Sequence, residues 1–234
     1  MAIITLEQVS KVYEMGETRV DALRDVTLEI EEQQFVSFVG PSGSGKTTLL
    51  NLIGCLDKPS DGNVYVDTVR VNDFATKEAA RFRGHYLGFI FQNFNLIPVL
   101  TVYENVEYPL IMVQNVPLGE RRTRIMHYLE AVGMLDQKDK LPSQISGGQK
   151  QRVAVARALV TNPKLVLADE PTANLDHASA FKVIELMRQM QRDLKTTFVF
   201  STHDPKIVEE AEIVFTLEDG QMMNKKTIKP QKAN

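Results

Sequence analysis

Short apolar runs separated by amphipathic stretches indicate an α/β protein. Residues 35–39 form an apolar run that stops at Gly40, which is typical of a strand buried on both faces. After a glycine-rich turn, residues 47–53 place leucine and isoleucine at helical spacing. The other predicted strands are residues 3–9, 26–30, 64–66, 87–91, 165–168, 197–201 and 213–217, and a helix is predicted over 179–194. Strands that alternate with helices favour a largely parallel sheet with helices on both faces.

The middle of the chain departs from this alternation. From residue 93 to about residue 144 the pattern is mostly helical, and Ile125, Leu129 and Val132 share one helix face. We therefore expect a helical subdomain inserted into the α/β core. The predicted division is residues 1–92 and 160–223 for the core, 93–159 for the helical subdomain, and 224–234 for a flexible, lysine-rich tail.

Composition and charge narrow the functional class. The chain has 27 lysines and arginines against 30 aspartates and glutamates, so no basic excess points to nucleic acid. The start of the chain lacks a secretory signal, and no apolar run approaches the ~20 residues that span a bilayer. We expect a protein that is soluble when expressed alone, or peripheral on a membrane through a partner. The single cysteine, Cys55, is expected to be buried.

A phosphate-binding loop follows the first buried strand. Eight consecutive residues match the pattern GxxxxGK[ST]: Gly40, Pro41, Ser42, Gly43, Ser44, Gly45, Lys46 and Thr47. The glycines allow backbone N–H groups to converge on phosphate oxygens, Lys46 supplies a positive charge, and the Thr47 hydroxyl is suited to Mg²⁺. A simple tight turn is disfavoured by the strand before the loop and the helix after it. Kinases, GTPases and ATPases all share this loop, so other residues must decide between them.

Two acids end the strand at 165–168. Because consecutive strand residues point to opposite sides, Asp169 and Glu170 can perform different tasks. Asp169 is suited to hold Mg²⁺, and Glu170 is suited to act as general base on the attacking water. The alternative, a solvated pair of acids at a strand end, is disfavoured by the phosphate loop.

A second predicted helix start is suited to an anion. Ser146, Gly147, Gly148 and Gln149 precede a strongly helix-forming stretch. A serine with two glycines at this position is either an ordinary helix N-cap or an anion-binding helix N-terminus.

With Ile145 before them, these four residues resemble the signature sequence of ATP-binding-cassette (ABC) ATPases. The resemblance covers residues 4–222 in order and spacing. It implies a P-loop NTPase (RecA-like) core with a mostly parallel sheet, ABC-type N-terminal antiparallel strands and an inserted helical subdomain. Ile145 in place of leucine and Lys150 in place of glutamine are small departures that remove no chemical group.

The resemblance also assigns roles to single residues. It implies a Q-loop at Gln92, a D-loop ending in Asp176, a switch histidine at His203, and a ring at Tyr13 that stacks on adenine. The implied catalytic residues are Glu170, His203, Gln92 and Lys46, and the implied Mg²⁺ ligands are Thr47, Gln92 and Asp169. The implied contacts to ATP are Tyr13, the loop Gly40–Thr47, Thr48, Gln92, Ser146–Gln149 and Asp176.

The family resemblance implies a homodimer that closes head to tail on ATP and drives an integral membrane permease from the cytoplasmic face of the bacterial inner membrane. Residues 91–106 and the motif after Asp169 resemble the LolD/MacB/FtsE-like branch, which serves lipoprotein release, macrolide or peptide export, antimicrobial-peptide resistance and cell division. Residues 94–101 are the expected docking segment. One alternative is an FtsE-like ATPase that signals through a membrane partner without transport. A soluble ABC ATPase is less favoured, because the chain holds one cassette and no heptads.

Overall fold

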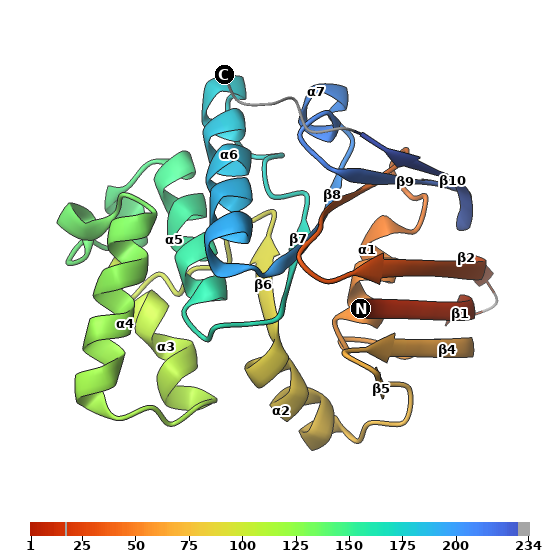
Figure 1. Cartoon of the computed structure of the whole chain (residues 1–234), viewed down its shortest axis with the longest axis horizontal. Coiled ribbons are helices and arrows are strands. Elements are labelled where there is room, and N and C mark those ends of the chain that lie inside the picture. Colours follow the sequence, from red (N-terminus) through yellow and green to blue (C-terminus); the bar gives the residue numbers. More distant parts are fainter. Residues whose placement is uncertain (17, 229–234) are drawn as a thin grey trace.

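The computed structural model describes residues 1–16 and 18–228, which fold around two β-sheets (Figure 1). The larger sheet has six strands in the order β10-β9-β3-β8-β7-β6. All neighbours in this sheet are parallel except β9 and β10. Its strands are β3 (Phe35–Val39), β6 (Leu87–Phe91), β7 (Leu165–Asp169), β8 (Thr197–Thr202), β9 (Ile213–Glu218) and β10 (Gln221–Thr227). The predicted mostly parallel sheet is confirmed.

The smaller sheet is antiparallel and built largely from the start of the chain. Its order is β2-β1-β4-β5, with the strands β1 (Ala2–Met15), β2 (Thr18–Glu31), β4 (Asp61–Val66) and β5 (Val69–Arg70). β1 and β2 extend well beyond the predicted ranges 3–9 and 26–30. The first residues of β2 are exposed, so this part of the hairpin carries no apolar alternation that the sequence could reveal.

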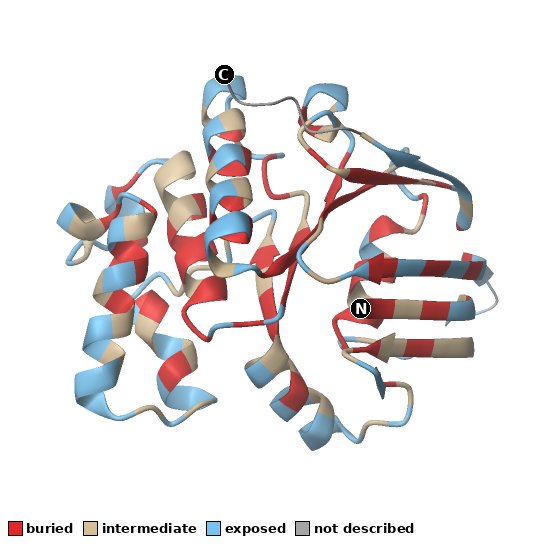
Figure 2. Ribbon diagram, in the orientation of Figure 1, coloured by how far each residue is buried: buried red, intermediate tan, exposed pale blue. Residues whose placement is uncertain are grey.

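Two apolar clusters hold the layers together, one on each face of the larger sheet. Figure 2 shows that β7 and β8, in the middle of the molecule, are mostly buried. Phe35 belongs to one cluster, whereas Val36 and Phe38 belong to the other, as expected for a strand buried on both faces. Cys55 is buried in the second cluster, as predicted.

Helices cover the larger sheet and extend beyond one edge. They are α1 (Lys46–Ile53), α2 (Thr76–Tyr86), α3 (Val102–Met112), α4 (Leu118–Ala131), α5 (Gly147–Leu159), α6 (His177–Leu194) and α7 (Pro205–Val208), with 3₁₀ turns at Leu135–Gln137 and Pro142–Gln144. α3 and α4 lie beside α5 on the left of Figure 1. Ile125, Leu129 and Val132 are buried there as predicted. α2 lacks a predicted counterpart, because Phe82 is its one buried residue.

The tail that the sequence analysis places at 224–234 begins within a strand of the structure, at residues 224–227. These residues belong to β10, which pairs with β9 through Thr227, and the Ile228 N–H donates to the Glu212 carbonyl at 2.8 Å. A strand ladder is built from backbone groups, so an edge strand with exposed lysines needs little apolar surface. Residues 229–234 lie outside the described residues.

No helix in the described part of the chain is both long enough and apolar enough to cross a membrane.

Candidate active site

The turn between β3 and α1 packs closely against the backbone of β9 and β2, and its glycines are required for this close packing. Gly43 and Gly45 have φ of 80° and 101°, in the left-handed region that side chains disfavour. A Cβ on Gly40 would lie 2.0 Å from the Leu217 carbonyl oxygen, and one on Gly45 would lie 2.5 Å from that of Ala22. The backbone of the loop is therefore held in one shape by its surroundings.

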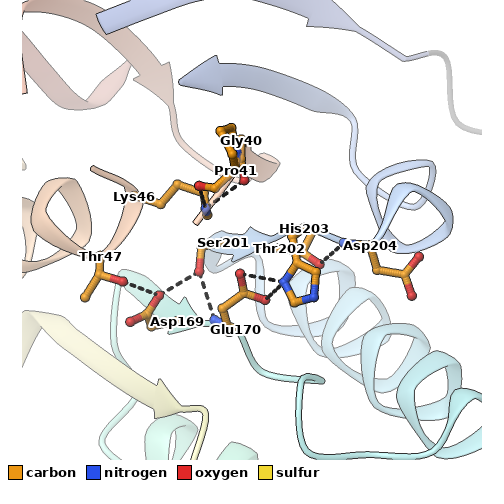
Figure 3. A network of polar contacts seen from close by, with 10 residues as sticks. All are labelled: Gly40, Pro41, Lys46, Thr47, Asp169, Glu170, Ser201, Thr202, His203 and Asp204. Carbon is orange, nitrogen blue, oxygen red and sulfur yellow. Dashed lines mark hydrogen bonds and ion pairs between the residues drawn. The ribbon is translucent and has the colours of Figure 1, made fainter. Parts of the chain in front are cut away.

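Lys46, near the end of the loop, carries a positive charge that points toward the backbone of the loop. The Lys46 ammonium donates to the carbonyl oxygens of Gly40 at 2.8 Å and Pro41 at 2.9 Å (Figure 3). α1 begins at Lys46, so its first-turn N–H groups and the positive end of its dipole also face this turn. Such an arrangement is suited to bind phosphate.

The two acids at the end of β7 face different partners (Figure 3). Asp169 Oδ1 accepts hydrogen bonds from the hydroxyls of Thr47 at 3.2 Å and Ser201 at 2.7 Å. Glu170 has a left-handed φ of 45°, and its carboxylate oxygens lie 3.0 and 3.1 Å from His203 Nδ1. The predicted division of the acid pair into two separate environments is present in the structure.

Ser201 joins these two environments, and no motif of the sequence includes it. Its fully buried hydroxyl donates to Asp169 and accepts from the Glu170 N–H at 2.8 Å. The available signal was a serine near the end of an otherwise apolar strand, which alone is more common as a structural residue. The contact arises because β7 and β8 are neighbours in the sheet.

An open cleft of about 730 Å³, a size that suits a small-molecule ligand, lies against part of the loop and beside Glu170 and His203. Asp169 and Ser201 are not among its lining residues. Of the predicted residues, those that line it are Ser42, Gly43, Gly45, Lys46, Thr47, Thr48, Gln92, Glu170 and His203. The sequence did not predict the other lining residues, which include Val20, Ala22 and Arg24 of β2 and Asp219 after β9.

Tyr13 does not line the cleft. Its hydroxyl donates to Asp57 Oδ2 at 2.8 Å, and the Lys11 ammonium lies 4.8 Å from the ring centroid. Burial and the hydrogen bond to Asp57 raise the pKa of the Tyr13 phenol. The ladder between β1 and β2 places Tyr13 opposite Val20, which does line the cleft. Its stacking role stays a prediction.

The residues of the predicted second anion site lie elsewhere on the chain. Ser146 caps α5: its hydroxyl accepts from the Gln149 N–H at 3.3 Å, and Gln149 Oε1 accepts from the Ser146 N–H at 2.9 Å. Asp176 caps α6 in the same way by accepting from the Ser179 N–H at 3.0 Å. A Cβ on Gly148 would lie 3.3 Å from the Ser179 side chain, so the two helix starts lie side by side. None of Ser146–Gln149 and Asp176 lines the cleft among its described residues.

The oxygens of Thr47 and Asp169 suit Mg²⁺, which needs few protein ligands, better than a metal ion that is held by protein side chains alone. No group of three or more His, Cys, Asp or Glu side chains is gathered for a metal within residues 1–16 and 18–228. Mg²⁺ commonly binds through one or two protein oxygens together with substrate phosphates and water. The adjacent oxygens of Thr47 and Asp169 match this requirement. For Gln92, the third predicted ligand, the structure places the residue in the cleft, and its metal role stays a prediction.

Comparison with known proteins gives a consistent result. The sequence profile described as ABC transporter matches residues 23–173. The uncharacterized ABC transporter ATP-binding protein MJ0796 of Methanocaldococcus jannaschii is 45% identical over 223 residues, which cover 94% of this chain and 95% of that protein. The macrolide export ATP-binding/permease protein MacB of Rhodopirellula baltica is 41% identical, over 93% of this chain and 32% of that protein.

A solved structure extends the likeness to three dimensions. The dimeric, post-hydrolysis structure of the ATP-binding cassette MJ0796 bound to ADP and Pi aligns with a TM-score of 0.89 and 42% identity. The alignment covers 97% of this chain and 100% of that one.

Proposed function

The chain belongs to the ABC transporter family and is an ATPase, and on this premise we propose that it powers an integral membrane permease by closing on ATP as a head-to-tail dimer. The proposed permease is of the type that releases lipoproteins, exports macrolides or peptides, or confers resistance to antimicrobial peptides. The relative MacB supports this choice, because its name describes a macrolide export protein that combines an ATP-binding part with a permease. The proposed location is the cytoplasmic face of the bacterial inner membrane.

The cleft is the proposed site of ATP. The loop N–H groups, the start of α1 and the Lys46 ammonium would bind the phosphates, and Thr47 and Asp169 would hold Mg²⁺. When bound, Mg²⁺ neutralises charge on the phosphates during transfer. Glu170 would take a proton from the water that attacks the γ-phosphorus, so that ADP and phosphate are the products. His203 would hold the Glu170 carboxylate in place, and Gln92 would orient the water.

The observation that supports the dimer is the separation, within one chain, of two helix starts suited to bind phosphate. The start of α1 opens into the cleft, whereas Ser146–Gly148 at the start of α5 lie outside it. A second copy, turned head to tail, would bring its α5 start to the ATP in the cleft of the first. ATP then binds the closed dimer better than the open chain and shifts the equilibrium toward closure.

A change of charge at Ser146 tests this arrangement without removing the helix cap. Aspartate, asparagine and serine are about equally good N-caps, so Ser146→Asp and Ser146→Asn should both fold. In a Glu170→Gln background, which slows hydrolysis, Ser146→Asp should weaken the ATP-dependent dimer by at least about tenfold, because its carboxylate would face the triphosphate of the other copy. Dimer formation is measured by sedimentation or light scattering.

Ser146→Asn is the matched neutral control and should dimerise like the Glu170→Gln parent. ATP affinity of the monomer should be equal in all three chains, because Ser146 does not line the cleft of its own chain. If Ser146→Asp dimerises with ATP as well as the parent does, the serine–glycine turn does not contact ATP across the interface.

A second hollow offers a surface for the proposed permease. It has a volume of about 530 Å³, and apolar atoms make up most of its lining, which includes Leu56, Ile97, Tyr108 and Val113. Leu56 and Tyr108 are 47% and 44% exposed. Asn95 and Ile97 of the predicted docking segment also line it. Exposed apolar side chains gathered in one groove are typical of an interaction site.

Tyr108→Glu should abolish retention of the permease. The introduced charge would be buried in an apolar interface without a partner, a cost of about 3 kcal/mol or more, which corresponds to over a hundredfold in affinity. The measurement is co-purification of an integral membrane protein from solubilised membranes. Leu118→Glu, on an exposed leucine of α4 outside the groove, is the control and should retain the same protein.

Equal retention by Tyr108→Glu and the wild type would exclude this groove as the docking site. The helices of the retained protein, in number and topology, distinguish a permease from a signalling partner of the FtsE-like kind.

A further inference from the structure

The segment after β6 reaches both hollows of the molecule. Gln92 lines the cleft that holds the phosphate loop, whereas Asn95 and Ile97 line the apolar groove. Only a few residues of this segment therefore separate the cleft from the groove.

This segment has an unfavourable backbone conformation. Phe94 and Asn95 have φ of 61° and 47°, so two consecutive non-glycine residues occupy the left-handed region. Asparagine tolerates this region, but a bulky phenylalanine does so at a cost in energy. The surrounding structure must hold such a conformation in place.

Arg157, in the last turn of α5, stabilises this backbone conformation. Its guanidinium donates from Nη1 to the Asn95 carbonyl oxygen at 2.5 Å and from Nη2 to the Phe94 carbonyl oxygen at 2.7 Å. Burial lowers the pKa of the guanidinium to about 10, so it stays charged at neutral pH. The rigid fork of donors on arginine matches two neighbouring carbonyl groups in a way that a lysine ammonium does not.

Both ends of the segment are also fixed. At the cleft end, the Asn174 side-chain amide donates to the Gln92 carbonyl oxygen at 3.0 Å and to Asn93 Oδ1 at 2.9 Å. At the groove end, the fully buried Asn105 accepts from the Ile97 N–H at 2.7 Å and donates to its carbonyl oxygen at 3.1 Å. Arg157 thus holds the strained middle between two anchored ends.

We propose that Arg157 is a positioning residue: by holding Phe94 and Asn95 in the left-handed conformation, it presents Gln92 to the cleft. This proposal rests on the proposed function, because Gln92 is taken to orient the water in hydrolysis. Arg157 also lines the groove, so a partner that binds in the groove would lie close to Arg157.

Arg157→Met, which keeps the unbranched apolar stem of the side chain and removes the guanidinium donors, tests the proposal. Amide hydrogen exchange in the nucleotide-free chain should become roughly tenfold faster in residues 92–97 alone, as expected for the loss of hydrogen bonds from a charged group. The kcat for ATP hydrolysis should fall roughly tenfold, whereas KM should change less than about twofold, because Lys46 and the loop are unaffected. Arg157→Lys should recover part of both properties.

Arg152→Met, on the same helix, is the matched control. Its guanidinium lies near Gly133 and not on residues 92–97, so exchange of that segment should equal that of the wild type. Phe94→Gly combined with Arg157→Lys provides a second test, because Phe94 is the residue for which the left-handed conformation costs energy. Glycine adopts a positive φ without a Cβ penalty, so this double variant should have slower exchange in 92–97 and a higher kcat than Arg157→Lys alone.

Three results would overturn the proposal. One is exchange of residues 92–97 in Arg157→Met at the wild-type rate. Another is faster exchange throughout α5 and the sheet, which would reveal a general structural role. The third is no gain from Phe94→Gly in the Arg157→Lys chain. Exchange without nucleotide does not depend on a permease or on dimer closure, so these results are separate from failure of the proposed function, which the Ser146→Asp experiment detects.

Discussion

Replacement of Glu170 by glutamine should lower kcat for ATP hydrolysis by about 10² to 10⁴, the usual contribution of a general base. Glutamine has the same shape and still offers an oxygen to His203, but it does not accept a proton from water. Because Glu170 lies beside the phosphate loop and does not contact it through any described hydrogen bond, ATP affinity should remain near that of the wild type. The variant should therefore accumulate as an ATP-bound dimer.

Single-turnover hydrolysis and light scattering with ATP measure the two parts of this expectation. Glu209→Gln, which removes the same charge from an exposed position at the end of α7, is the control and should hydrolyse ATP normally. Normal turnover by Glu170→Gln would mean that another group takes the proton.

Replacement of Lys46 by alanine should weaken ATP binding by about 10- to 150-fold, which corresponds to the loss of hydrogen bonds from a charged group. Lys46 is 7% exposed and is held over the loop by two carbonyl groups, so its charge is already in place before ATP arrives. Titration calorimetry with a non-hydrolysable ATP analogue gives the affinity.

Lys77→Ala, on an exposed lysine of α2, controls for the loss of one positive charge. Thermal unfolding of Lys46→Ala checks that the loop has not destabilised the chain, since the removed ammonium also binds Gly40 and Pro41. An affinity equal to that of the wild type in a folded Lys46→Ala chain would contradict the role of this loop in binding phosphate.

Sequence patterns predicted those strands and helices whose buried positions are occupied by apolar side chains. β3 and β6 are apolar and were predicted with the bounds they have in the structure. The outer part of the β1–β2 hairpin and the strand β10 are exposed, so their pairing rests on backbone hydrogen bonds that leave no apolar pattern. α2 is amphipathic only weakly, because it buries a single phenylalanine.

Prediction of the site residues was limited in a similar way. Motif residues that are close in sequence, such as Lys46 and Thr47 or Asp169 and Glu170, could be predicted together. Contacts between distant elements could not, because a hydrogen bond from Ser201 to Asp169 or from Arg157 to Asn95 depends on which strands and helices are neighbours. Tyr13 shows the reverse case: its motif position was clear, yet the structure engages its hydroxyl with Asp57 outside the cleft.

The hydroxyl of Ser201 has a single proton, and that proton is committed to Asp169 while a lone pair accepts from the Glu170 backbone. Asp169, the proposed metal ligand, and the backbone of Glu170, the proposed base, are thereby oriented by one buried atom before any substrate arrives. The entropic cost of aligning these two groups is met when the sheet folds, and little of it is left for each catalytic cycle. Successive turnovers would then differ in what occupies the cleft and in how two copies meet, while the ends of β7 and β8 remain a fixed frame.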